Sequence, residues 1–217
     1  MTRPAGDLEL IGYGPSVYCW IVRWTLAEIG LAARWREVDP FAPRDGPPDW
    51  PHPFGRVPVL IHGELTLYET AAITRYLDEA FPGPGLQPGA PAARARLVQI
   101  QSLVDTYAYW PLVRQVFAQA VFAPASGTPG DAAEVEAGLK AAQPVLAALD
   151  ALASDEAFLL GADLSLADLH LGPMLAYFAM APEAAALVER SRRLGPWLRR
   201  IARRPAFRAT WPPLPKS

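Results

Sequence analysis

Cysteine and histidine are scarce in this sequence. Cys19 is the single cysteine among 217 residues, so no disulfide can form within the chain, and a reducing compartment such as the cytoplasm fits best. The three histidines, His52, His62 and His170, do not have the spacing of known metal-binding motifs, and we expect no metal. These shortages exclude a disulfide-stapled fold and a histidine–cysteine zinc centre.

Long apolar runs and an excess of one charge are also missing. No segment approaches the roughly 18 consecutive apolar residues of a membrane helix, and residues 1–10 hold no apolar stretch of signal-peptide length. The net charge of −2 gives no general attraction for nucleic acid. Hydrophobic residues make up 51% of the chain and charged residues 19%, which allows a sizeable core. We expect a folded cytoplasmic protein with neither a membrane nor a nucleic acid as partner.

Proline is abundant, with 24 residues, and its positions are informative. Segment 81–91 alternates proline with glycine, so it can neither continue a helix nor join a central strand. We place a domain boundary there, with a first domain at residues 1–83 and a second at residues 91–217.

The two halves differ in hydrophobic period. The first half alternates strand and helix patterns, with strands predicted at 8–11, 34–38, 57–61 and 65–68 and helices at 16–30 and 70–80. The second half is helical throughout, with helices predicted at 92–122, 131–152, 165–178, 182–190 and 196–203 and kinks at Pro111 and Pro144. The pattern therefore predicts an α/β half followed by an all-α half.

Four stretches, taken in order, carry a resemblance to a known family. They are S-V-Y-C-W-I-V-R at 16–23, G-R-V-P-V-L at 55–60, E-T-A-A-I at 69–73 and S-L-A-D at 165–168. Around a Pro/Gly linker, this combination resembles the cytosolic glutathione transferases, and the spacing of the first stretch is most similar to their serine-type, zeta-like or bacterial branch. The resemblance implies a thioredoxin-like glutathione-binding domain followed by an α-helical domain that holds a second substrate.

Ser16 stands where the first strand turns into the first helix, so its hydroxyl faces the positive end of that helix. Taken alone, this position favours an ordinary N-cap serine. The resemblance implies a catalytic role instead, in which the hydroxyl donates a hydrogen bond to the thiolate of glutathione. Cys19 lies one turn further on without a second cysteine near it, and a structural thiol is the better interpretation.

The resemblance also implies a set of glutathione-binding residues. Val57, before a cis proline, offers its backbone to the cysteinyl unit, while Glu69 pairs with the α-ammonium group. Thr70 opens a helix whose N–H groups suit the glutamyl carboxylate, and it replaces the serine that is usual in the family. Arg56 is a further candidate, for the glycine carboxylate, and His52 is a weaker one.

The second substrate is expected to be a hydrophobic electrophile. Tyr109 and Arg114, in an aromatic stretch of the helical half, are candidates for lining its pocket. The family also implies a homodimer, with the first domain of one subunit packing on the second domain of the other, and a role in detoxification. The seven arginines between 190 and 204 are interleaved with apolar residues, and we interpret them as the solvated face of an amphipathic helix.

Two alternatives to conjugation stay open. One is a zeta-like glutathione-dependent cis–trans isomerase, suggested by the Trp20-x-Val22-Arg23 spacing, although Val17-Tyr18 departs from the Ser-Cys usual in that branch. The other is a binding or regulatory protein that kept the fold without turnover. The pattern identifies neither the electrophile nor the strength of the dimer.

Overall fold

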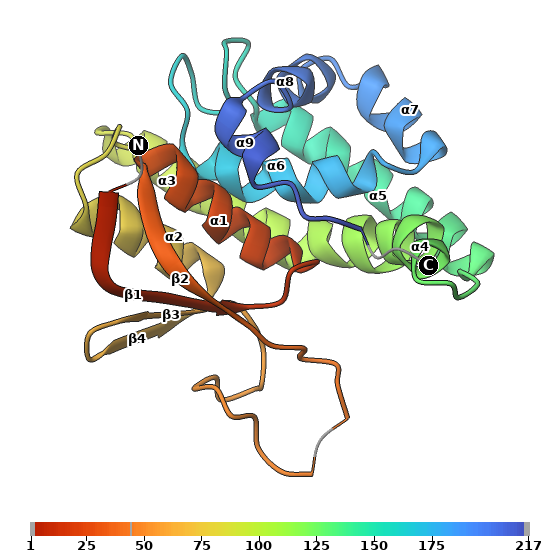
Figure 1. Cartoon of the computed structure of the whole chain (residues 1–217). Helices are drawn as coiled ribbons and strands as arrows, with labels where there is room; N and C mark the ends of the chain where they lie inside the picture. The colour runs from red at the N-terminus through yellow and green to blue at the C-terminus, as the bar shows by residue number, and fades with distance from the viewer. Residues whose placement is uncertain (1–2, 44, 215–217) are drawn as a thin grey trace. The chain divides into compact units, whose positions relative to one another are not determined.

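The computed structural model describes residues 3–43 and 45–214, and the chain forms two compact units (Figure 1). The first unit comprises the described residues up to Gly85 together with Ala209–Pro213, and the second comprises the rest from Leu86 onward. The division between Gly85 and Leu86 falls inside the Pro/Gly segment 81–91. Nothing in the sequence pattern indicated that residues 209–213 return to the first unit.

The first unit is built on a four-stranded sheet with the order β2-β1-β3-β4. The strands are β1 (Arg3–Gly12), β2 (Leu31–Glu37), β3 (Val59–His62) and β4 (Leu65–Tyr68). β1 and β2 are parallel because helix α1 connects them, whereas β3 is antiparallel to both β1 and β4. Helices α1 (Val17–Ile29) and α2 (Thr70–Ala80) pack against each other on one face of this sheet, as Figure 1 shows.

Helix α1 forms the centre of the first unit. It begins after Ser16 and ends at Gly30, whose φ of 71° is the left-handed conformation that glycine adopts without strain. Its tryptophans, Trp20 and Trp24, are fully buried. The indole Nε1 of Trp20 donates to Thr210 Oγ1 at 3.2 Å, and its ring meets that of Trp211 edge-on at 4.7 Å. These contacts explain why the 209–213 segment belongs to the first unit.

The regular elements of the second unit are all helices in the part of the chain that the structure describes, and an isolated β-bridge joins Phe158 to Gly161 in one loop. Its elements are α3 (Pro91–Leu103), η1 (Val104–Phe122), α4 (Ala123–Ala125), α5 (Ala132–Leu152), α6 (Leu166–Phe178), α7 (Pro182–Arg190), α8 (Leu194–Ile201) and α9 (Pro205–Ala209). Every residue of α6 is buried, so this helix is the core of the unit. None of the helices formed by the described residues combines the length and the apolar character needed to cross a membrane.

The long helix predicted at 92–122 departs from regular α geometry. From Val104 to Phe122 it is a π-helix, η1, in which hydrogen bonds join residues five apart. The predicted perturbation at Pro111 lies inside this segment, where the proline has no N–H to donate. Pro144 lies inside α5, which remains one helix from Ala132 to Leu152.

The S-L-A-D motif forms the predicted capping box at the start of α6. Asp168 accepts hydrogen bonds from the N–H and Oγ of Ser165, at 2.9 and 2.6 Å. It also accepts from the N–H of Leu159 at 2.8 Å and from the indole of Trp197 at 2.7 Å. The carboxyl is fully buried, and burial raises its pKa while these bonds act in the opposite direction. Asp168 therefore joins α6 to both the 154–165 loop and α8.

Candidate functional site

The sheet register brings three separate stretches of the first unit to one end of the sheet. Ile11 of β1 pairs with Val59 of β3, and Val59 pairs in turn with Tyr68 of β4. Beyond these pairs, β1 runs on into the turn at 12–16, and β4 runs on into α2. β3 enters from Val57–Pro58 at this same end. Three of the motifs singled out in the sequence therefore converge here.

Ser16 is the N-cap of α1. Its Oγ accepts the N–H of Cys19 at 3.3 Å, and its own N–H donates to the carbonyl of Tyr13 at 2.9 Å. The capping interpretation is thereby confirmed, and it does not conflict with a second role. A hydroxyl has two acceptor sites and one proton, so the cap bond from the Cys19 N–H does not use that proton, although the Cys19 thiol is within hydrogen-bonding reach of the same hydroxyl. The side chain is half-buried at the positive end of the helix.

Cys19 is fully buried and is a structural thiol. Its sulfur accepts the N–H of Tyr13 at 3.4 Å. Burial raises the pKa of this thiol to about 11, although the contacts with Ser16 and Tyr13 and the charge of Arg23 act against the rise. The thiolate is therefore scarce at neutral pH, and Cys19 has the character of a small core side chain.

The sequence patterns predicted no function for two tyrosines close to Ser16 in the chain, Tyr13 and Tyr18. Tyr13 precedes it in the turn, is half-buried, and has its pKa raised by burial first and then by the charges of Asp39 and Glu37. Its hydroxyl therefore stays protonated at neutral pH. Tyr18 occupies the second position of α1 and is also partly exposed. Tyr13 lies in the turn before Ser16 and Tyr18 in the first turn of α1, so each carries a hydroxyl group on a residue close to Ser16 in the chain.

The Val57–Pro58 peptide is cis, as the resemblance implies. The backbone N–H and C=O of Val57 form no hydrogen bond with another described residue. Val57 is half-buried because its side chain packs on a cluster of Ile11, Trp50 and Val59. An extended peptide could therefore pair with this backbone as an added strand.

Glu69 has the only positive φ among the described residues other than glycine, 70°, and its side chain is exposed. It precedes α2 without capping it through the side chain, so the first N–H groups of α2 lack that partner. Non-glycine residues held at positive φ concentrate at functional sites. Thr70, the first residue of α2, is buried.

His52 and Arg56 lie close to Glu69. Burial lowers the pKa of His52, the charge of Arg56 lowers it further, and the carboxylate of Glu69 opposes both effects. His52 Nδ1 accepts the N–H of Phe54 at 3.1 Å, so Nε2 carries the proton of the neutral ring. Arg56 is exposed, and its carbonyl accepts the indole N–H of Trp50 at 2.9 Å. The buried Trp50 thus anchors this long loop.

Tyr109 and Arg114 lie on η1 in the second unit. Tyr109 is half-buried and Arg114 is exposed. Their separation of five residues places them one turn apart in a helix with i to i+5 hydrogen bonds. In a regular α-helix, the same separation would turn them well away from each other.

Comparison with known proteins identifies the family. Residues 10–85 match the glutathione S-transferase N-terminal domain, and residues 132–200 match the glutathione S-transferase C-terminal domain. The chain is 31% identical to glutathione S-transferase 4 of Zea mays over 199 residues, which cover 88% of both chains. This chain belongs to the glutathione S-transferase family. The predicted fold class, a thioredoxin-like domain followed by an α-helical transferase domain, is confirmed.

Two further relatives extend this comparison. The solved structure of glutathione S-transferase III in its apo form has a TM-score of 0.84 and 29% identity, and the match covers 98% of this chain and 100% of that one. A stringent starvation protein A homolog of Pasteurella multocida is 30% identical over 161 residues, which cover 73% of this chain and 69% of that protein. The chain is therefore also similar to a protein whose name specifies no transferase.

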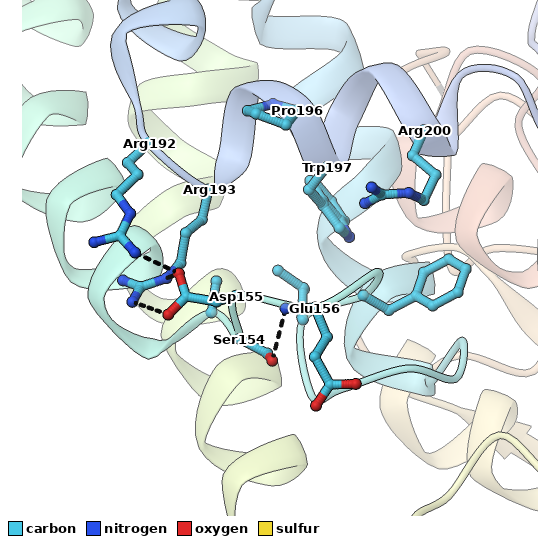
Figure 2. Close-up of a pocket in the computed structure, with 11 residues that line it drawn as sticks. Ser154, Asp155, Glu156, Arg192, Arg193, Pro196, Trp197 and Arg200 are labelled. Atoms are coloured by element: carbon cyan, nitrogen blue, oxygen red, sulfur yellow. Dashed lines mark hydrogen bonds and ion pairs between the residues drawn. The ribbon is translucent and has the colours of Figure 1, made fainter.

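A cavity of about 190 Å³ in the helical unit of this transferase-family chain is shown in Figure 2. Arg193 bonds both carboxylate oxygens of Asp155, at 2.8 and 3.0 Å, and Arg192 bonds the same group at 2.8 Å. Arg200 donates to the carbonyl of Ala157 at 2.6 Å. The hydrogen bond from Arg193 is the main reason that the pKa of Asp155 is lowered. These arginines join the loop at 154–161 to α8 and to the two residues before it, so they have contacts within the unit as well as solvent-exposed surface.

Acidic, cysteine and histidine side chains do not gather into a metal-binding group anywhere in residues 3–43 and 45–214. The candidate site of this family member is the sheet end in the first unit, because the strand register brings three of the motifs together there. It contains a hydroxyl at one helix start, an unpaired backbone segment and an open second helix start.

Proposed function

We propose that this chain is a glutathione transferase that uses Ser16 to hold the glutathione thiol as a thiolate for attack on a hydrophobic electrophile. The observation that carries the proposal is the register at the sheet end. It places the Ser16 turn, the Val57 backbone and the start of α2 on neighbouring strands. Catalysis then rests on proximity and on control of the thiol pKa, without a covalent enzyme intermediate.

The dimensions of the sheet agree with a bound tripeptide. Neighbouring strands are about 4.8 Å apart, so β1 and β4 are separated by about 10 Å across β3. Three extended residues span about 10 Å. Glutathione lying across the strand ends would therefore place its sulfur near Ser16 and its γ-glutamyl end near α2, with the cysteinyl unit beside Val57.

The ends of glutathione match the charges near α2. Its γ-glutamyl group carries one carboxylate and one ammonium. The first N–H groups of α2, with Thr70, suit the carboxylate, while the exposed Glu69 suits the ammonium. Arg56 and the Nε2–H of His52, in the loop before Val57, are the donors that we propose for the glycine carboxylate.

The energy required of Ser16 is within reach of one hydrogen bond. A free thiol has a pKa of about 8.5, and lowering it by about 2 units requires about 2.7 kcal/mol in favour of the anion. A hydrogen bond to a charged group contributes about 1.5–3 kcal/mol, and the helix dipole adds to it. Because Ser16 has a proton left after capping α1, it can supply that bond without weakening the cap.

For the second substrate, the proposal names only its chemical class and two residues of its pocket. Tyr109 and Arg114 are the proposed lining of the electrophile pocket, and a homodimer acting in cytoplasmic detoxification follows the family pattern. If Tyr109→Phe and Arg114→Ala both left the kinetics with every accepted electrophile unchanged, this part of the proposal would be wrong.

A regulatory, non-catalytic role is the second candidate, because the Pasteurella multocida relative is named for stringent starvation and for no transfer reaction. The open start of α2 and the position of the Ser16 hydroxyl at the start of α1 favour a glutathione enzyme. Conjugation of a generic aryl halide separates the catalytic role from the regulatory one. A cis–trans isomerisation assay with a maleyl-type diketo acid separates conjugation from the zeta-like reaction.

The deciding experiment is an ultraviolet difference titration of bound glutathione against pH. We expect Ser16→Ala to raise the pKa of the bound thiol by 1–2 units, the value of one charge-assisted hydrogen bond. Tyr13→Phe and Tyr18→Phe remove neighbouring hydroxyls and should leave this pKa within about 0.3 units. An unchanged pKa in Ser16→Ala, or a rise in Tyr18→Phe instead, would remove Ser16 from the mechanism.

A further inference from the structure

The main chain of Gly14, two residues before Ser16, is held on both sides by charged side chains. Its N–H donates to Glu37 Oε1 at 2.8 Å, and its carbonyl accepts from Arg23 Nη2 at 3.2 Å. Glu37 is the last residue of β2, and Arg23 lies in α1. Two elements on either side of the turn therefore restrain a single peptide segment.

Trp35 joins these two side chains to each other. Its indole Nε1 donates to Glu37 Oε2 at 2.7 Å, and the Arg23 guanidinium lies 5.5 Å from the centre of its ring. The ring also covers Gly12, where an added Cβ would lie only 2.5 Å from it. We call Gly14, Arg23, Trp35 and Glu37 the Gly14 clamp.

Strand pairing explains the position of the clamp. Gly12, at the end of β1, pairs with Glu37, and the carbonyl of Gly12 accepts the N–H of Val38 at 2.8 Å. The end of β2 therefore lies alongside the start of the turn that leads to Ser16. The N–H of Ser16 returns to the carbonyl of Tyr13, so a shift of Gly14 would move Ser16 with it.

The charge of Glu37 works against an anion at this helix start. Its carboxylate raises the pKa of both Tyr13 and Cys19, whereas the charge of Arg23 lowers that of Cys19. A carboxylate in this position is therefore costly for a site that must hold a thiolate. The geometry it imposes on Gly14 is the compensating benefit.

We propose that Glu37 is a positioning residue, which holds Gly14 through the clamp and thereby aims the Ser16 hydroxyl at the thiol of glutathione. The proposal rests on the function proposed for Ser16. Sequence reasoning did not find Glu37, because its contact with Gly14 joins residues 23 positions apart.

The test compares two substitutions at Glu37 in the full chain. Glu37→Gln keeps an oxygen for the Gly14 N–H and removes the charge, whereas Glu37→Ala removes both. We expect Glu37→Ala to lower kcat for aryl halide conjugation about fivefold, to raise the bound thiol pKa, and to change KM for glutathione less than twofold, as for the loss of one exposed hydrogen bond. Glu37→Gln should restore most of kcat, with only the small loss also expected for Trp35→Phe because the Trp35 N–H loses its acceptor, and should give a thiol pKa equal to or below that of the wild type.

Two further variants keep the result interpretable. Asp39→Asn removes another negative charge near Tyr13 without touching Gly14 and should leave kcat unchanged. Trp35→Phe keeps a ring over Gly12 and removes the N–H that Glu37 accepts, so it should lower kcat in the same direction by a smaller factor. Amide exchange at Gly14, followed by NMR, should be faster in Glu37→Ala than in Glu37→Gln.

The experiments distinguish failure of the positioning role proposed for Glu37 from failure of the function proposed for Ser16. If Ser16→Ala raises the thiol pKa while Glu37→Ala matches Glu37→Gln in kcat and in thiol pKa, the positioning role is wrong and the proposed function stands. A change confined to KM in Glu37→Ala would also overturn it. If Ser16→Ala has no effect on the thiol pKa, both proposals are wrong.

Discussion

The starts of α6 and α2 provide an instructive comparison, since each carries an acidic residue from one of the sequence motifs. At α6, Asp168 is fully buried and accepts hydrogen bonds from Ser165, Leu159 and Trp197. At α2, Glu69 is exposed, has a φ of 70° and makes no side-chain cap hydrogen bond. We call the start of α6 closed because a side chain caps it, and the start of α2 open because no side chain does. A closed helix start stabilises the fold, whereas an open and strained one has polar groups available for a ligand.

The largest expected effect is on stability, at the closed start of α6. Asp168→Ala leaves four buried donors without an acceptor, and we expect it to lower the free energy of unfolding by about 3–5 kcal/mol. Urea denaturation measures this loss. Asp155→Ala, an exposed acid in the same unit, is the control and should cost much less. Equal losses in the two variants would contradict the structural role of Asp168.

At the open start we expect an effect on binding instead. Glu69→Gln removes the charge proposed to meet the glutathione ammonium and should raise KM for glutathione about tenfold. Its free energy of unfolding should change by less than about 0.5 kcal/mol, since the side chain is exposed. Glu64→Gln, an exposed acid in the β3–β4 turn, should alter neither quantity. A KM within twofold of the wild type would remove Glu69 from the binding site.

The strain at Glu69 can be measured separately. Glycine adopts positive φ without a Cβ clash, so Glu69→Gly should raise the free energy of unfolding by about 0.5–1 kcal/mol while glutathione binding weakens. Thermal and urea unfolding, set beside KM, give both quantities. A loss of stability in this variant would mean that the conformation of Glu69 is not strained.

The smallest expected effect concerns pH. The pKa of His52 is lowered from the unfolded value of about 6.5, so the unfolded chain binds this proton more readily. The contribution of His52 to stability is therefore complete above pH 6.5 and decreases as the pH falls towards the folded pKa. Replacing it in His52→Asn should flatten the dependence of the urea midpoint on pH between 5 and 7. Parallel profiles for the two proteins would contradict this.

Local sequence patterns predicted much of the fold. The helix predicted at 70–80 and the strand predicted at 65–68 have these bounds in the structure, and the S-L-A-D capping box is confirmed. Such features depend on residues within one or two turns, whose types are visible as motifs. The π-helical geometry of η1 and the short helix α9 were missed, since no local pattern distinguishes them.

In the candidate site, too, some residues could be predicted from sequence motifs and others could not. Ser16, Val57, Glu69 and Thr70 came from motifs with a family resemblance, and their roles remain proposals that the experiments above test. His52 was only a weaker candidate for the glycine carboxylate, and neither its proximity to Glu69 nor the contact between Glu37 and Gly14 was predicted. Both depend on how a long loop and a neighbouring strand return to the same sheet end.

The sequence by itself determined the alternation of elements, the caps that begin and end them, and the family to which they belong. These properties are set by short-range hydrogen bonding and by hydrophobic period. Tertiary structure alone decided which polar groups are satisfied and which are left open, because strand register brings together residues far apart in the chain. That is why Asp168 became part of the core while Glu69 stayed exposed at the open start of α2.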